Sequence, residues 1–123
     1  MKPEEAESLL EQALQADRSS VRATILCGDA QLAKGDTEAA LVTWRRVEQQ
    51  SVPHTALVAT RLMDGYRKVG RPQEGVSLLK SYLEQASSID LLEVVFKAVI
   101  ELEGVDAAKQ VVLDELRRTP GTP

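Results

Sequence analysis

The sequence has 123 residues, of which 43% are hydrophobic and only 3% aromatic, and this composition predicts one globular, mostly helical domain. Its net charge of −4, its pI near 5.0 and the scattering of its basic pairs among more numerous acids argue against nucleic-acid binding. No apolar run approaches the roughly 18–20 residues of a membrane span, and residues 1–20 lack a signal peptide's apolar stretch. We therefore expect a cytoplasmic chain that does not insert into a membrane by itself.

Helical periodicity predicts seven helices in chain order, at about 3–16, 20–33, 36–50, 55–69, 72–86, 88–102 and 105–118. Three of them carry a clear apolar face at i, i+3, i+4 and i+7: Ala59, Leu62, Met63 and Tyr66; Leu79, Tyr82, Leu83 and Ala86; Leu92, Val95, Phe96 and Val99. Between the helices, Gly35 suits a left-handed turn before an Asp36 N-cap, and Pro72 suits a first helical position. We expect residues 51–54, which include Pro53, to break the chain between two units.

A period of 33–35 residues relates these helices. Gly35 recurs as Gly70 after 35 residues, and Gly75 recurs as Ala108 after 33. The first helix recurs after 34 residues, since Ala6, Leu10 and Ala13 become Ala40, Trp44 and Val47. Such a period is typical of stacked helix pairs. The sequence thus predicts a single all-α, right-handed α-solenoid over 1–123, with a half repeat at 3–18, repeats at 20–53, 54–87 and 88–120, and a tail at 121–123.

At these positions the chain resembles the tetratricopeptide repeat, a helix–turn–helix unit of about 34 residues. The matching residues are Gly28, Ala40, Trp44, Leu62, Tyr66, Gly70, Ala108 and Pro120, with Gly75 in place of Ala. The departures are Thr24, Cys27, Gln31, Val47 and Glu115. The resemblance covers nearly the whole chain and implies a non-catalytic scaffold for protein–protein interaction.

Segments 9–50 and 91–120 are also similar to the later repeats of bacterial regulators of lipopolysaccharide assembly. That resemblance implies a position at the cytoplasmic face of the inner membrane, with the lipid A deacetylase and a membrane protease as partners. Those regulators carry a membrane helix and a paired Cys-x-x-Cys metal module that are absent from this sequence, so we interpret it as a fragment and carry over neither role. Two alternatives stay open: a regulatory segment of an enzyme such as an N-acetylglucosaminyl transferase, and a chaperone-adaptor module.

The inner groove of the solenoid is the predicted site for a protein or peptide partner. Its candidate residues on the first helices of the units are Arg22, Asp29, Asp64, Arg67, Lys68, Asp90, Glu93 and Lys97. Chaperone adaptors clamp a C-terminal carboxylate with Lys and Asn, whereas the corresponding positions here hold Ile25, Asp29, Thr60 and Asp64. This difference disfavours the adaptor function. The competing interpretation is that the charges only keep the surface soluble.

No set of residues in the sequence predicts catalysis, a metal or a cofactor. Cys27 and His54 are the only cysteine and histidine, and two such ligands cannot complete a zinc site. We expect His54 to be exposed in a loop, and Cys27 and the lone Trp44 to be buried core residues. The sequence therefore predicts that the chain is not an enzyme.

The two ends of the solenoid predict a homodimer. A repeat array needs polar capping units, because each unit buries one flank on the next. We expect apolar residues to be left uncovered on the first and last helices, namely Leu9, Leu10, Leu14, Ala107, Val111 and Val112.

Overall fold

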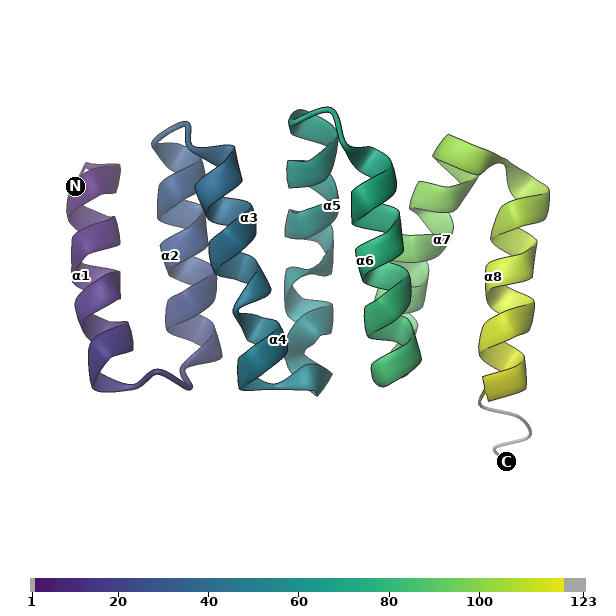
Figure 1. Cartoon of the computed structure of the whole chain (residues 1–123), viewed down its shortest axis with the longest axis horizontal. Helices are drawn as coiled ribbons and strands as arrows, with labels where there is room; N and C mark the ends of the chain where they lie inside the picture. Colours follow the sequence, from purple (N-terminus) through teal and green to yellow (C-terminus); the bar gives the residue numbers. More distant parts are fainter. Residues whose placement is uncertain (1, 119–123) are drawn as a thin grey trace.

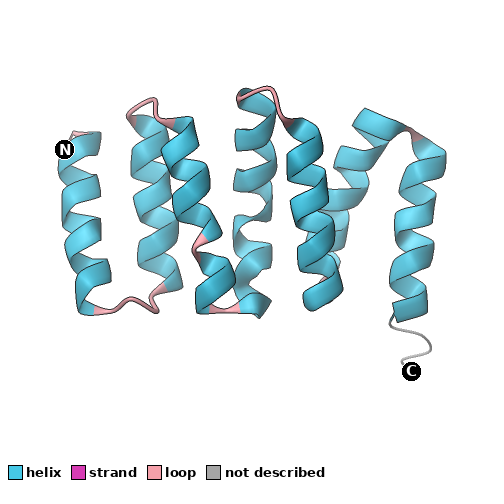
Figure 2. Cartoon of the chain, viewed as in Figure 1, coloured by secondary structure: helices cyan, strands magenta, loops and turns pink. Residues whose placement is uncertain are grey.

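The computed structural model describes residues 2–118, which form a row of helices joined by short turns (Figure 1). No strand occurs in this described part of the chain (Figure 2), and the expected all-α class is confirmed. The helices are α1 (Pro3–Ala16), α2 (Val21–Ala33), α3 (Thr37–Arg45), α4 (Val47–Gln50), the 3₁₀ helix η1 (Val52–Val58), α5 (Ala59–Lys68), α6 (Pro72–Gln85), α7 (Ile89–Glu103) and α8 (Val105–Arg118). Pro120 and the expected tail at 121–123 lie outside the described residues.

Two of the seven predicted helices differ from the prediction in their continuity. The helix expected at 36–50 is interrupted at Arg46, which separates α3 from α4. The break expected at 51–54 is confirmed but shorter, because only Ser51 is extended between α4 and η1, and η1 begins at Val52. Pro53 lies in the first turn of η1, where its missing N–H leaves no helical hydrogen bond unmade.

The turns between helices follow the expected chemistry. Gly35 has φ of +91°, a left-handed angle that residues with a Cβ adopt at a cost. The Asp36 carboxylate then accepts a hydrogen bond from the Ala39 N–H at 3.1 Å and caps α3. Pro72 begins α6, as expected. These local features fix where each helix begins and ends.

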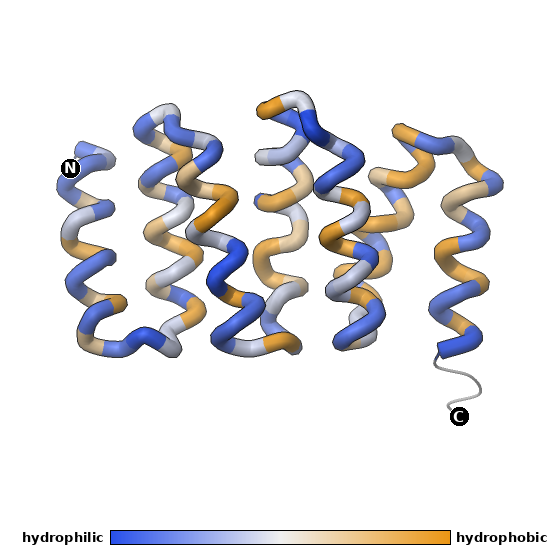
Figure 3. Tube along the Cα trace, in the orientation of Figure 1, coloured by the Kyte–Doolittle hydropathy of each residue, from blue (hydrophilic) through white to orange (hydrophobic). Residues whose placement is uncertain are grey.

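Most of the apolar residues form one core that extends from α3 to α8. It contains Trp44, Leu62, Leu79, Tyr82 and Val95, all almost fully buried. A second, small cluster joins α1 to α2 through Leu14, Ala23 and Cys27, with Leu10 packed against it. Figure 3 shows the apolar positions spaced along every helix, with polar residues between them.

The expected apolar faces are confirmed on α5 and α6, and need correction on α7. Leu92 and Phe96 are only half-buried, whereas Leu91 and Ala98 are fully buried together with Val95 and Val99. The buried face of α7 is therefore rotated by about one residue. The reason is that α7 packs against α5, α6 and α8 at once, and this environment favours the neighbouring stripe.

The two ends of the row are better covered than the sequence indicates. Leu14 and Val111 are buried, so the expectation that they are uncovered is wrong. Leu10, Ala107 and Val112 are half-buried. The most exposed apolar side chains at the ends are Leu9 on α1, and Val105 and Leu116 on α8.

Trp44 is the largest buried side chain of the core, and Gly28 makes room for it. The Trp44 side chain is only 1% exposed, and its indole N–H donates to the Ile25 carbonyl at 3.1 Å. A Cβ on Gly28 would lie 2.2 Å from the indole nitrogen. The glycine thus lets the indole lie directly against α2, and the expected core positions of Trp44 and Cys27 are confirmed.

Candidate partner-binding groove

Two neighbouring hollows follow the line between α2 and α5, and they share Arg61. We call them together the α2–α5 groove. The first hollow, of about 530 Å³, is lined by Val21, Arg22, Ile25, Leu26, His54, Leu57 and Arg61. The second, of about 440 Å³, is lined by Asp29, Leu32, Trp44, Thr60, Arg61, Asp64, Gly65 and Lys68. The groove therefore joins the first helices of two successive units.

An ion pair spans the groove where the two hollows meet. The Arg61 guanidinium binds Asp29 through two parallel contacts, Nε to Oδ1 at 2.8 Å and Nη2 to Oδ2 at 3.0 Å. The hydrogen bond to Asp29 raises the pKa of Arg61 above its ordinary value. Such a bidentate pair fixes both side chains in one geometry, so Asp29 is neutralised within the protein.

The second carboxylate of the groove is also paired. Asp64 accepts from Arg67 Nη1 at 3.0 Å, and the same guanidinium contacts Glu101 on α7 at 3.0 Å. In contrast, no ion pair within residues 2–118 involves Arg22 or Lys68. The unpaired charge along the α2–α5 groove is therefore positive, although the whole chain carries −4.

The groove also presents apolar side chains to solvent. Leu26 on α2 is 46% exposed, and Leu57 on η1 is 54% exposed; both line the first hollow. Ile25 lies half-buried beside them. Exposed leucines gathered in a hollow with a polar rim are typical of a surface that binds another protein.

The eight residues expected to line one groove are divided by the structure. Arg22, Asp29, Asp64 and Lys68 line the α2–α5 groove. Arg67 links α5 to α7 instead of lining a hollow.

The remaining three candidates, Asp90, Glu93 and Lys97, lie on α7. Glu93 pairs with Lys97 on its own helix at 3.3 Å. Glu93 also lines a separate hollow of about 210 Å³ between α7 and α8, with Phe96 and Val112. A role of the eight residues in partner binding stays a prediction.

Sequence reasoning missed Arg61, which is central to the groove. A signal for it was present, because several ion pairs and hydrogen bonds join residues close to one period apart. Arg61 and Asp29 are separated by 32 residues, Arg71 and Glu38 by 33, and Arg67 and Glu101 by 34. A search for opposite charges at this spacing would have identified Arg61.

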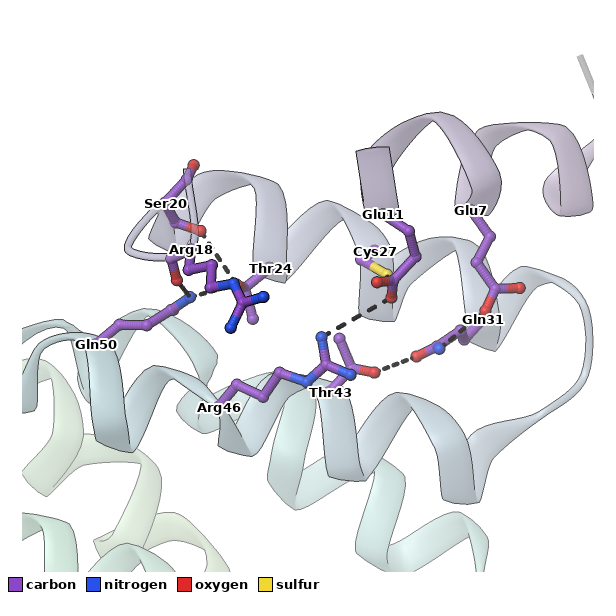
Figure 4. Close-up of polar contacts among 10 residues, drawn as sticks. All are labelled: Glu7, Glu11, Arg18, Ser20, Thr24, Cys27, Gln31, Thr43, Arg46 and Gln50. Atoms are coloured by element: carbon purple, nitrogen blue, oxygen red, sulfur yellow. Dashed lines mark hydrogen bonds and ion pairs between the residues drawn. The ribbon is translucent and has the colours of Figure 1, made fainter. Parts of the chain in front are cut away.

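Three departures from the repeat pattern, Thr24, Cys27 and Gln31, make polar contacts among α1–α4 (Figure 4). Gln31 donates to Glu7 at 3.0 Å and accepts from the Thr43 hydroxyl at 2.6 Å, so it connects α1, α2 and α3. Thr24 pairs with Gln50 of α4 at 2.7 Å. Polar residues at buried repeat positions are tolerated here because each finds a partner.

Cys27 belongs to the same network, and its surroundings keep the thiol protonated. The Sγ–H donates to Glu11 of α1 at 3.1 Å, and the side chain is fully buried (Figure 4). Burial, and then the neighbouring Glu11 carboxylate, raise the pKa of the Cys27 thiol to about 12. The thiolate needed for a nucleophile is therefore scarce at neutral pH.

The remaining candidate for chemistry, His54, is exposed as expected, but it lies in η1 and not in a loop. Its Nδ1 lies 2.6 Å from the Ser51 hydroxyl, and the ring borders the first hollow. In residues 2–118 no three His, Cys, Asp or Glu side chains are grouped as metal ligands. None of the helices within that range is long and apolar enough to span a bilayer.

The stacked helix pairs define the chain as an all-α helical-repeat protein. Residues 2–60 match the tetratricopeptide-repeat family model, which confirms the resemblance expected from the sequence over this part of the chain. Such repeats indicate a scaffold for protein–protein interaction.

The chain is also similar to lipopolysaccharide assembly protein B of Escherichia coli, in strains K12, O6:H1 and O157:H7. It is 28% identical to each of them over 116 residues, or 94% of this chain. The chain spans about 30% of the length of these relatives.

Proposed function

We propose that this chain is a non-catalytic interaction scaffold that acts in the control of lipopolysaccharide assembly, at the cytoplasmic face of the inner membrane. The observation that carries the proposal is the similarity to lipopolysaccharide assembly protein B over 94% of the chain. The proposed limits of its repeats are 20–53, 54–87 and 88–120, after the half repeat at 3–18.

The α2–α5 groove supports this proposal because it has the features of a binding surface. Leu26 and Leu57 are exposed within it, while Arg61 and Asp29 hold its two walls together. The thiol of Cys27 is buried and protonated, which fits a structural role better than a catalytic one. The groove is therefore where we place the partner protein.

The two alternative functions receive less support. The relatives named above are neither N-acetylglucosaminyl transferases nor chaperone adaptors. Moreover, an adaptor binds its carboxylate with Lys and Asn, and the corresponding positions here hold Ile25, Asp29, Thr60 and Asp64, none of which supplies a cation.

Binding to purified partners tests the proposal. The resemblance to lipopolysaccharide-assembly regulators suggests two baits, a bacterial lipid A deacetylase and the cytoplasmic part of a membrane protease. We expect the immobilised 123-residue chain to bind at least one of them in biolayer interferometry. A Leu26→Ala, Leu57→Ala double variant should weaken that binding, because it removes the apolar surface of the first hollow.

Val42→Ala is the matched control, because Val42 is 66% exposed on α3 and lies outside the groove. It should leave binding unchanged. The proposal is overturned if the chain binds neither bait, or if the control weakens binding as much as the double variant does.

A further inference from the structure

The charge pattern of the α2–α5 groove indicates what kind of peptide it accepts. Each carboxylate in the groove already has a partner, Asp29 with Arg61 and Asp64 with Arg67. Arg22 and Lys68 have no ion-pair partner among the described residues, and both side chains are exposed. A ligand that enters the groove therefore meets two cations without an ion-pair partner and two carboxylates that are each bound to a guanidinium, of which Arg67 also binds Glu101.

The two cations stand at opposite ends of the groove. Arg22 lies in the first turn of α2, and Lys68 is the last residue of α5. Figure 1 shows α2 and α5 running in the same direction, so residues one 34-residue period apart lie at the same level along the two helices. Lys68 therefore lies level with Lys34, which follows Arg22 by 12 residues (34 − 22). With a rise of 1.5 Å per residue, the backbone positions of the two cations are separated by about 18 Å along the groove.

The exposed apolar surface lies between these ends. Leu26 and Leu57 occupy the first hollow, beside Arg22, and Leu32 lines the second hollow, toward Lys68. An extended peptide covers about 18 Å with five or six residues. The groove thus offers apolar contacts to the middle of a short segment and a cation to each of its ends.

We propose that the groove binds a short extended segment of a partner protein that has leucine-like side chains at its centre and carboxylates at both ends. This inference rests on the proposed scaffold function and specifies the chemistry of the partner. The chain's overall charge repels acidic ligands at long range, so selection of an acidic segment depends on Arg22 and Lys68 at close range. Because both charges are exposed, their contribution to affinity decreases with salt.

Three synthetic peptides of eight residues test the proposal, all acetylated and amidated. The first has glutamate pairs at both ends and leucines at the third and fifth positions. The second replaces the glutamates by lysines, and the third replaces the leucines by alanines. We expect the first peptide to shift backbone amide NMR signals in residues 21–34 and 52–68, and to bind about tenfold more tightly than either of the others, with affinity that falls between 50 and 300 mM salt.

Charge-reversal variants identify the residues responsible. Arg22→Glu combined with Lys68→Glu should weaken the glutamate peptide about tenfold and strengthen the lysine peptide. Lys109→Glu is the matched control, because Lys109 is exposed on α8 outside the groove, and it should leave both affinities unchanged.

Equal binding of the lysine and glutamate peptides, absence of binding by the glutamate peptide, or equal weakening by the control would overturn the inference. The outcome is separable from that of the scaffold proposal. If the chain binds a purified bait but shows no preference among the peptides, only the acidic-segment inference fails. If it binds neither baits nor peptides, both fail.

Discussion

Replacing Gly28 by alanine should destabilise the fold, although alanine favours helix. In an unconstrained helix interior, Gly→Ala stabilises by about 1 kcal/mol. Here the added methyl group would lie 2.2, 2.4 and 2.8 Å from three atoms of the Trp44 indole, where carbon atoms normally approach to about 3.5–4.0 Å. The indole has to move by more than an ångström, and its hydrogen bond to the Ile25 carbonyl is lost.

The size of this effect follows from the competing terms. Overpacking a core costs about 1–3 kcal/mol, and a lost hydrogen bond adds about 1 kcal/mol. If the indole is expelled, the cost approaches the roughly 3–5 kcal/mol of a Trp→Ala truncation. After subtracting the gain in helix propensity, we expect Gly28→Ala to lower the free energy of unfolding by about 1–4 kcal/mol, or the melting temperature by about 3–20 °C.

Urea denaturation followed by tryptophan fluorescence measures this directly, because Trp44 is the only tryptophan. The folded Gly28→Ala protein should also show a changed emission spectrum. Gly70→Ala is the control: its Cβ would meet no atom within 4 Å, and its cost comes only from φ of +77°. It should lose stability without altering the folded emission. A Gly28→Ala protein as stable as wild type, with unchanged emission, would refute the packing argument.

Three further predictions concern the core, the thiol and the ends. Ala40→Glu should lower the free energy of unfolding by several kcal/mol, because Ala40 is 0% exposed, whereas Val42→Glu on the same helix should be nearly neutral. Equal melting temperatures of the two variants would contradict this. Native Cys27 should resist Ellman's reagent at pH 8 and react in urea, and rapid labelling of the native protein would show an accessible thiol. Because the pKa of the folded Cys27 thiol is raised to about 12, its contribution to stability is complete below pH 9 and is lost as the pH rises toward 12. Sedimentation equilibrium should show self-association of the chain, and the double variant Leu113→Glu, Leu116→Glu on α8 should reduce it. A monomeric mass at all concentrations would contradict this prediction.

The fold could be predicted from the sequence because the helical period and the repeat period both indicate stacked helix pairs. Pro72, Asp36 and Gly35 mark helix boundaries by local chemistry, so their positions needed no knowledge of tertiary structure. The interruption at Arg46 between α3 and α4 could not be predicted from such local signals. The conversion of residues 52–58 into a 3₁₀ helix was missed because Pro53 was taken to end a unit, whereas a proline is equally suited to a first turn.

The groove could be predicted only in part from the sequence, for a different reason. Helical spacing places Asp29 and Asp64 on the surface of the correct helices, but it does not show which charges are already paired. The pairing depends on side-chain reach between units, as in the contact of Arg67 with Glu101. The free charge of the groove, which decides its ligand, therefore became visible only with the structure.

The separation of the apolar residues into two clusters has a consequence for motion. Helix α1 shares no buried residue with the main core; it is held by Leu14 and by polar contacts from Glu7 and Glu11. Segments with few buried apolar contacts open at a lower free energy than the molecule as a whole. Protection of backbone amides against hydrogen exchange should therefore be weakest in α1 and rise toward α3. Transient departure of α1 would expose Cys27 and Gln31 while the rest of the array stays folded, so the first helix behaves as a separately opening unit.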